Sequence, residues 1–237
     1  MNWFSDSYFE IGSTHKVCQD YAAHKDGFAV LSDGCSTSPN TDVGSRFICL
    51  NALLEEPLPM KALISTAGLV GVPKEALFAT QLHVSLTDNG EWLTPVMDGD
   101  GYLLAVSNDG QIHLTMIEYP DNMPWYPVYA EIPTGRELFV DRKPTVTALA
   151  GHHRRVENLF LCTSLYSFVA VCSDGLGTFK TKDGTLVPAL EIAKCLVDVK
   201  VRGGKFMHRR IQSLKRNAWA DLHHEDDFAI AVLIGEK

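Results

Sequence analysis

Three apolar runs, far apart in the chain, each carry a carboxylate at one end. The runs are residues 28–34, 169–175 and 226–232. Asp33 and Asp174 close the first two runs, each followed by glycine, and Asp226 opens the third. Each run has the length and composition of a buried β-strand, and burial in one sheet system would bring the acidic ends together. Grouped carboxylates repel one another unless they are protonated or bridged by cations. The pattern therefore indicates a site for a pair of hard divalent metal ions, and with it metal-assisted hydrolysis.

The composition is that of a globular protein with one domain over residues 1–237. The 237 residues are 46% hydrophobic, which supports a substantial core, and 21% are charged. The net charge of -8 argues against a general nucleic-acid binder, whose affinity comes largely from neutralising phosphates. Two local basic stretches, residues 152–155 and 209–216, stand out against this acidic background.

The expected compartment is cytoplasmic. No segment has the layout of a signal peptide, and no apolar run approaches the roughly 20 residues that span a bilayer, so a membrane partner is not expected. The six cysteines include no Cys-x-x-Cys pair, which makes a disulfide framework or a zinc site improbable. Buried free thiols fit a reducing environment.

The hydrophobic pattern predicts an α+β protein in which runs of strands alternate with blocks of helices. Strands are predicted at residues 8–17, 28–33, 92–97, 102–107, 111–117, 145–150, 158–163 and 168–173, and in a final segment after Asp226. Helices are predicted at residues 42–54, 60–69, 74–86, 188–199 and 205–223. Residues 98–101, Asp-Gly-Asp-Gly, are typical of a hairpin turn between two strands. Residues 121–143, rich in proline and aromatics, are predicted to be irregular with a short strand or two.

Five acidic landmarks occur in a set order along nearly the whole chain. They are Gln19-Asp20, Asp33-Gly34, Gly99-Asp100-Gly101, Ser173-Asp174-Gly175 and Asp226-Asp227. In this order, and beside apolar strands, they resemble the metal-dependent serine/threonine phosphatases of the protein phosphatase 2C type, in a divergent bacterial-like form. The resemblance implies a β-sandwich of two antiparallel sheets flanked by helix pairs, in α-β-β-α layers, with metals in a cleft at one end.

The resemblance also implies a ligand set for Mn²⁺ or Mg²⁺. Asp33 would bridge two ions, the Gly34 carbonyl would contribute to the second, and Asp174 and Asp226 would hold the first. Asp100 would match a carboxylate that binds a third, weaker ion. In such a centre a water that bridges the two metals attacks the phosphorus of a phosphoserine or phosphothreonine. Asp33 and Asp174 are therefore expected to be catalytic as well as metal-binding.

Two further residues are expected to act in catalysis, and four positions depart from the family pattern, one of which is His15. Asp20 would orient metal-bound water without touching a metal, and His15 lies near the place of an arginine that grips the substrate phosphate. Gln19 stands where a glutamate is usual, and Cys35 where many animal members carry a histidine proposed as general acid. Thr178 replaces an aspartate that commonly supports the third metal. The resulting site is less acidic than the family norm, which predicts weaker metal affinity.

Simpler explanations exist for several of these residues. Asp-Gly pairs commonly end strands as turns, and for Asp100 turn chemistry and metal binding are equally open. His15 fits a loop or core histidine as well as a phosphate contact. Asp227 is expected to be solvated or hydrogen bonded, and His223 and His224 to finish a helix rather than bind metal. The basic helix near residues 205–215 is expected to be a solvated amphipathic face rather than a docking surface.

The leading functional hypothesis is a phosphoprotein phosphatase in signalling, with a phosphorylated protein as its substrate. The alternative is a catalytically weak or inactive member of the fold that acts as a binding or regulatory module, favoured by Gln19, Cys35 and Thr178. A hydrolase of small phosphoesters would share the chemistry and differ only in substrate.

Overall fold

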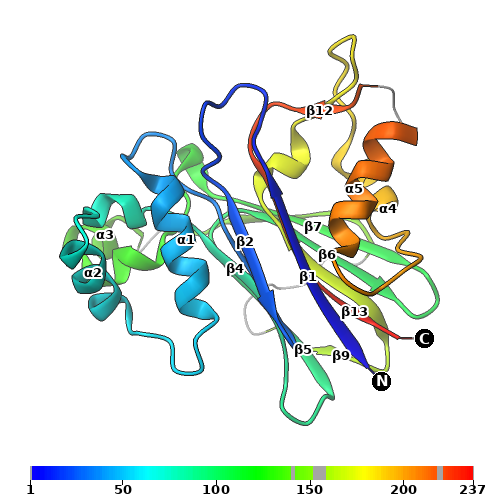
Figure 1. Cartoon of the computed structure of the whole chain (residues 1–237), viewed down its shortest axis with the longest axis horizontal. Coiled ribbons are helices and arrows are strands. Elements are labelled where there is room, and N and C mark those ends of the chain that lie inside the picture. The colour runs from blue at the N-terminus through cyan, green and yellow to red at the C-terminus, as the bar shows by residue number, and fades with distance from the viewer. Residues whose placement is uncertain (1, 140–141, 152–158, 218–220, 237) are drawn as a thin grey trace.

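The computed structural model describes residues 2–139, 142–151, 159–217 and 221–236, and these form two facing antiparallel sheets with helices on both outer sides (Figure 1). The first sheet has the order β1 (Trp3–Glu10), β13 (Phe228–Gly235), β10 (Tyr166–Cys172), β6 (Gly101–Ser107), β7 (Ile112–Glu118) and β8 (Thr145–Ala150). The second has the order β2 (Tyr21–Lys25), β3 (Phe28–Ser32), β4 (Gln81–Leu86), β5 (Trp92–Asp98) and β9 (Leu161–Cys162). A short ribbon pairs β11 (Phe179–Lys180) with β12 (His223–His224).

Helices cover the two sheets from opposite sides (Figure 1). One group is α1 (Thr41–Ala52), α2 (Met60–Leu69) and α3 (Pro133–Phe139), and the other is α4 (Ala189–Leu196) and α5 (Phe206–Asn217). Single 3₁₀ turns are η1 (Lys74–Leu77), η2 (Pro120–Asn122), η3 (Pro127–Glu131) and η4 (Asp174–Gly177). This layering confirms the α+β sandwich expected from the sequence. Among the described residues, no helix is both long and apolar enough to cross a bilayer.

The central strands are buried on both faces, which explains why they read as continuous apolar runs. On β10, Val169 and Val171 face the core between the sheets, whereas Phe168 and Ala170 face the core under α4 and α5. All eight residues of β13 are buried in the same alternating way. Because successive side chains of a strand point to opposite faces, a strand between two cores needs apolar residues at every position.

The predicted helix over residues 74–86 is wrong. Only η1 is helical there, and residues 81–86 form β4, a central strand of the second sheet. Leu82 and Val84 point into the core between the sheets, whereas the flanking positions are only partly buried. This period of two is the signature of a strand, and it outweighs the helix propensity of the Lys-Glu-Ala-Leu segment before it.

The predicted hairpin at residues 98–101 is also wrong. β5 pairs with β4 and β9 in the second sheet, and β6 pairs with β10 and β7 in the first. The Asp-Gly-Asp-Gly segment therefore crosses from one sheet to the other. Gly99 and Gly101 adopt φ angles of 140° and 133°, and a Cβ at Gly99 would lie 2.4 Å from Thr80 Cγ2. These glycines are needed for close packing at a crossing rather than for a two-residue turn.

Four smaller expectations need correction. The first strand occupies Trp3–Glu10 and ends before the predicted segment 8–17 does. The described part of residues 121–143 contains 3₁₀ turns and α3 but no strand. His223 and His224 form β12 rather than a helix end, because they pair with β11. Of the strand predicted at 158–163, Leu161–Cys162 is observed, and residue 158 lies outside the described residues, as does the basic stretch 152–155.

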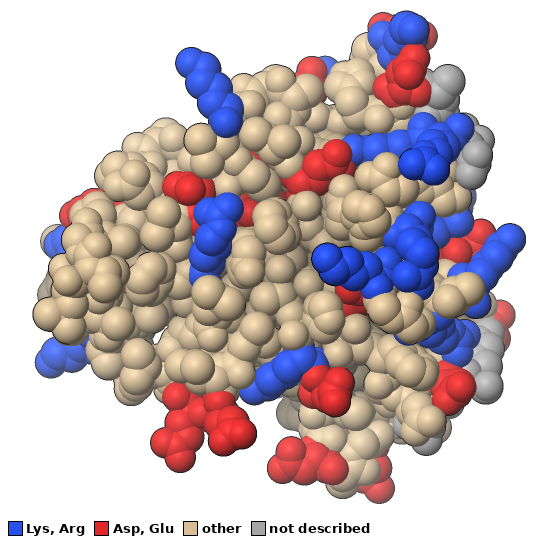
Figure 2. All heavy atoms as spheres, in the orientation of Figure 1, with Lys and Arg blue, Asp and Glu red and all other residues tan. Residues whose placement is uncertain are grey.

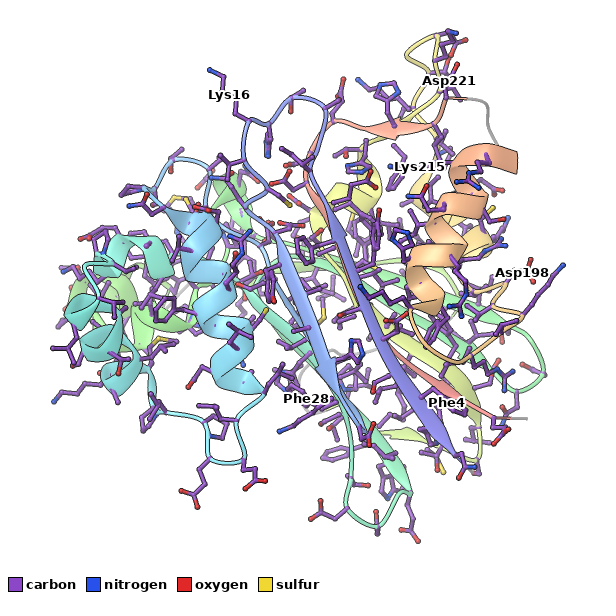
Figure 3. All side chains as sticks on the ribbon, in the orientation of Figure 1. Phe4, Lys16, Phe28, Asp198, Lys215 and Asp221 are labelled. Atoms are coloured by element: carbon purple, nitrogen blue, oxygen red, sulfur yellow. The ribbon has the colours of Figure 1, made fainter. Side chains whose placement is uncertain are left out.

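The basic helix α5 is amphipathic, as expected. Its apolar residues Phe206, Met207, Ile211 and Leu214 are buried in the core against the first sheet. Lys and Arg side chains gather on the outer face over α4 and α5 (Figure 2). Lys215, labelled in Figure 3, forms an ion pair of 2.5 Å with a glutamate at the end of β1.

Candidate metal centre

Strand register brings the acidic ends of five strands to one edge of the sandwich. β10 and β13 are antiparallel with Cys172 opposite Ile230, so Asp174 lies beside the start of β13. Tyr102 of β6 is also opposite Cys172, which places Asp100 next to the same point. In the second sheet Tyr21 pairs with Ser32, so Asp20 and Asp33 are neighbours. The two sheets then present these carboxylates toward one another.

A pocket of about 160 Å³ lies at this edge. Its lining includes every residue predicted to bind metal, together with His15 and Gln19: Asp33, Gly34, Asp100, Asp174 and Asp226. Asp20 does not line the pocket but is 1% exposed and lies beside Asp33 behind it. The structure thus brings together all the side chains that the sequence singled out.

The acidic side chains lie beside one another at this pocket, with Asp100 buried and Asp33 and Asp174 half-buried, and their pKa values are raised. Burial, and then the charges of Asp20 and Asp174, raise the pKa of Asp33 well above its usual range. Burial, and then the charges of Asp100 and Asp226, raise the pKa of Asp174 to about 7. Burial and the charge of Glu118 raise the pKa of Asp100 to about 6. Like charges in a low-dielectric site favour protonation unless a cation balances them.

Two carboxylate oxygens have no hydrogen-bond partner although they are buried. They are Oδ2 of Asp20 and Oδ1 of Asp100, which is 9% exposed. Buried polar atoms are normally paired, so orphaned carboxylate oxygens need an explanation. Oxygen donors of this kind suit Mn²⁺ or Mg²⁺, so the residues present fit such ions. Within the described residues, no three acidic, histidine or cysteine side chains already close on one point as a complete ligand group.

Asp227 organises the loop that closes one side of the pocket. Its side chain is 2% exposed, and Oδ1 accepts a hydrogen bond from Gly12 N at 2.7 Å. Its Oδ2 accepts one from Gln19 N at 2.5 Å. The buried carboxylate of Asp227 therefore holds both ends of loop 11–20 in place. Lys16, on this loop, projects into solvent (Figure 3). The expectation of a hydrogen-bonded Asp227 is confirmed, but its role in organising the loop was not predicted.

His15 lies on that loop between two acids. Its Nε2 is 3.3 Å from Asp226 Oδ1, and its Nδ1 is 3.1 Å from Asp227 Oδ2. Burial opposes protonation, but the hydrogen bond to Asp227 and the surrounding acidic charges outweigh it and raise the pKa of His15. The imidazole therefore lines the pocket between two carboxylates that favour its protonated form.

The other three departures from the family pattern, besides His15, have distinct local structures. Gln19 lines the pocket and donates from Nε2 to Thr41 Oγ1 at 2.9 Å. Thr178 accepts a hydrogen bond from Asp226 N at 3.2 Å and donates to the Gly175 carbonyl, so it joins η4 to the start of β13. Burial opposes ionisation of the Cys35 thiol in the pocket wall, but hydrogen bonds from Thr37, Tyr126 and Ser38 outweigh it and lower the thiol pKa.

Part of the pocket comes from the segment that the sequence left unassigned. Asn122, Pro124 and Tyr126 line it from the stretch between β7 and α3. Arg46, in the first half of α1, is not among the described lining residues; it bonds Asp42 and lies over the ring of Tyr21. His15 is the one basic side chain among the described residues that line the pocket.

Comparison with known proteins supports the fold. No protein-family model matches the chain, and no curated protein matches it. Among solved structures, the Mycobacterium tuberculosis serine/threonine phosphatase PstP/Ppp matches at 17% identity with a TM-score of 0.55, over 100% of both chains. A catalytic domain of PstP in complex with two manganese ions matches at 16% identity and a TM-score of 0.51, over 98% of this chain and 97% of that one.

A third match is PppA, described as a key regulatory component of the type VI secretion system in Pseudomonas aeruginosa. It is 18% identical, with a TM-score of 0.54, and the alignment covers 100% of this chain and 99% of PppA. At these identities the likeness concerns the fold. It confirms the architecture that the resemblance to protein phosphatase 2C implied.

Proposed function

We propose that the chain is a metal-dependent phosphatase that hydrolyses phosphoserine and phosphothreonine in proteins. The observation that carries this proposal is the convergence of Asp33, Asp100 and Asp174 on one pocket, with charges that no described Lys or Arg in its lining balances. The fold, shared with serine/threonine phosphatases, supports the same chemistry, and one neighbour was solved with two manganese ions.

The proposed ligand roles are those that the resemblance to protein phosphatase 2C implies. Asp33 would bridge two ions, with the Gly34 carbonyl on one and Asp174 and Asp226 on the other. Asp100 is proposed to hold a third, weaker ion. Mn²⁺ or Mg²⁺ bound there would supply neutralisation of phosphate charge and a lowered pKa for water.

Other residues would hold the substrate and the ligands in place. Asp20, buried behind the pocket beside Asp33, is proposed to hold the carboxylate of Asp33 in place and to orient metal-bound water. Protonated His15 would attract the anionic phosphate. Asp227 would act as a positioning residue, because it anchors the loop that carries His15.

A regulatory module is the second candidate function. It is favoured by the lining itself, in which His15 is the single basic side chain among the described residues where a phosphate would bind. A structural neighbour, PppA, is described as a regulatory component, which is compatible with this candidate. Such a module would bind a phosphopeptide without turning it over.

Hydrolysis and binding of the same substrate separate the two candidates. Phosphate release from a phosphoserine peptide would be measured with Mn²⁺, Mg²⁺ or EDTA, alongside peptide binding by fluorescence anisotropy. The phosphatase proposal expects turnover that needs the metal and disappears in EDTA. Saturable binding of the phosphopeptide over its unphosphorylated form, without turnover under any metal condition, would contradict it and favour the regulatory module.

A further inference from the structure

A second pocket of about 250 Å³ adjoins the candidate metal centre. It shares Asp100, Asn122 and Asp174 with the first pocket and continues toward the end of β7. The side chains that line only the second pocket include two tyrosines, a methionine and a glutamate: Tyr102, Tyr119, Met116 and Glu118. A ligand that occupies the first pocket can therefore extend into the second without leaving the protein surface.

The second pocket is acidic on one side and apolar on the others. Glu118, the last residue of β7, is exposed at its rim. Asp100 is 9% exposed at its inner end, and its Oδ1 has no hydrogen-bond partner. The walls are the rings of Tyr102 and Tyr119 and the thioether of Met116. None of the described lining residues is Lys, Arg or His.

This combination matches a cation on an apolar stem. A Lys or Arg side chain could lay its methylenes along Met116 and the tyrosine rings while its charged end meets Glu118, the one acid of this pocket that is not a proposed metal ligand. Cations are attracted to aromatic faces, and Arg stacks on them most readily. The volume lies below the roughly 300–1,000 Å³ of pockets for drug-sized ligands, so it suits a single side chain.

We propose that this pocket is a substrate subsite that receives a Lys or Arg side chain of the phosphoprotein, close in sequence to the phosphoresidue. The proposal rests on the phosphatase function proposed above and names its substrate class: phosphorylation sites flanked by basic residues. A divalent ion is the competing occupant, but two tyrosine rings and a thioether, which are poor ligands for a hard cation, line the pocket beside the carboxylates.

The test is a comparison of phosphoserine peptides that carry Arg, Ala or Glu at each of three positions on either side. The readout is kcat/KM for phosphate release by the wild-type chain and by Glu118→Gln. We expect one Arg position to be favoured over Ala by about three- to tenfold, and Glu at that position to be disfavoured. Glu118→Gln should remove most of this preference.

A matched control is Glu56→Gln, which removes one exposed carboxylate from the loop between α1 and α2. It should leave the Arg preference unchanged, because it lies outside both pockets. The subsite is refuted if no position prefers Arg, or if Glu118→Gln retains the full preference. It is equally refuted if Glu118→Gln changes the Mn²⁺ dependence to the same extent for Arg and Ala peptides, because the pocket would then bind metal.

Binding measurements keep this test independent of turnover. If no phosphopeptide is hydrolysed, the phosphatase proposal fails, and the labelled peptides are titrated and followed by anisotropy. A preference for the Arg peptide that is lost in Glu118→Gln would still support the subsite. Equal binding of the Arg and Ala peptides, or no binding of either, would overturn it.

Discussion

The basic helix α5 and the acidic strand ends are the two charged regions that stand out in the sequence. In the fold they differ in whether their charges are paired. On the α5 face the basic side chains are compensated: Arg210 pairs with Asp198 at 3.3 Å, and Lys215 with Glu10 at 2.5 Å. Arg209 donates to backbone carbonyls of the preceding loop. Burial opposes ionisation of Glu10, but hydrogen bonds from His224, Lys215 and Tyr8 outweigh it and lower its pKa to about 2.

At the edge of the sandwich the pKa shift of a carboxylate has the opposite direction to that of Glu10. Burial and like charges raise the pKa of Asp174 to about 7, and no described Lys or Arg lines the pocket to oppose this. A buried charge without a partner is costly, so a fold retains it only where something else supplies the compensation. Compensation within the fold, rather than the density of charge in the sequence, therefore separates the candidate functional region from the structural one.

The largest expected effect is a difference in turnover between two variants, one at an acidic residue of the pocket and one at an acidic residue of the α5 face. Asp174→Ala should lower metal-dependent turnover by at least about 100-fold, because it removes a proposed ligand, whereas loss of a residue that only supports a ligand typically costs 10- to 100-fold. Asp198→Ala, which removes the partner of Arg210, should leave turnover within about twofold of wild type. Phosphate release by the two variants, with circular dichroism to check folding, measures the difference. Similar activity of the two variants would contradict the distinction.

The second expected effect is a difference in stability between variants at two neighbouring acids, Asp227 and Asp226. Asp227→Asn should cost about 1–3 kcal/mol in the free energy of unfolding, because two buried backbone donors lose a charged acceptor. Asp226→Asn, at a side chain that is 42% exposed, should cost less than about 0.5 kcal/mol. Urea unfolding gives both values. Equal destabilisation would mean that Asp227 does not anchor loop 11–20.

A pH dependence should sharpen the contrast further. The raised pKa values of Asp174, about 7, and Asp100, about 6, fall to about 3.9 on unfolding. The folded chain therefore binds these protons more tightly, so their contribution to stability is greatest below about pH 4 and is lost as the pH rises toward 7. Because Mn²⁺ replaces protons as the balancing charge, its effect on Tm should be larger at pH 8 than at pH 5.5.

Thermal unfolding with Mn²⁺ and with EDTA at the two pH values measures this difference. The same series on Asp174→Ala should show a smaller pH dependence. A Tm shift from Mn²⁺ that is independent of pH in the wild-type chain would show that the ion does not bind at these carboxylates.

The smallest effect concerns the compensated region. Lys215→Ala should cost about 1 kcal/mol or less in the free energy of unfolding, since partly exposed ion pairs contribute little. Turnover should stay at the wild-type level because α5 contributes nothing to either pocket. A marked loss of activity would give the basic face a functional role that its internal pairing does not suggest.

The sequence predicted the site better than it predicted the connections around it. Apolar runs that end in Asp33 and Asp174 identified β3 and β10, because strands between two cores must be apolar throughout. The Asp-Gly-Asp-Gly segment had the composition of a hairpin, but its glycines are required by packing against Thr80 and Cys172 at a crossing between sheets. Local composition cannot distinguish these two uses of glycine.

Contacts between distant segments could not be predicted either, because local composition does not show which segments meet in the fold. Nothing near Asp227 in the sequence shows that its carboxylate meets Gly12 and Gln19, more than 200 residues away. Asn122 and Tyr126 enter the pocket from a segment without periodicity, which pattern analysis cannot place. The roles proposed for all the site residues remain predictions: His15, Asp20, Asp33, Gly34, Asp100, Asp174 and Asp226.

Hydrolysis of p-nitrophenyl phosphate tests the two-metal proposal most directly. The wild-type chain and Asp33→Asn would be assayed with Mn²⁺, with Mg²⁺ and with EDTA, because Asp33 is the carboxylate proposed to bridge both ions. We predict turnover by the wild-type chain that depends on the metal and is lost both in EDTA and in Asp33→Asn. Metal-dependent turnover that survives in Asp33→Asn, or the absence of turnover at every metal concentration, would contradict the proposal.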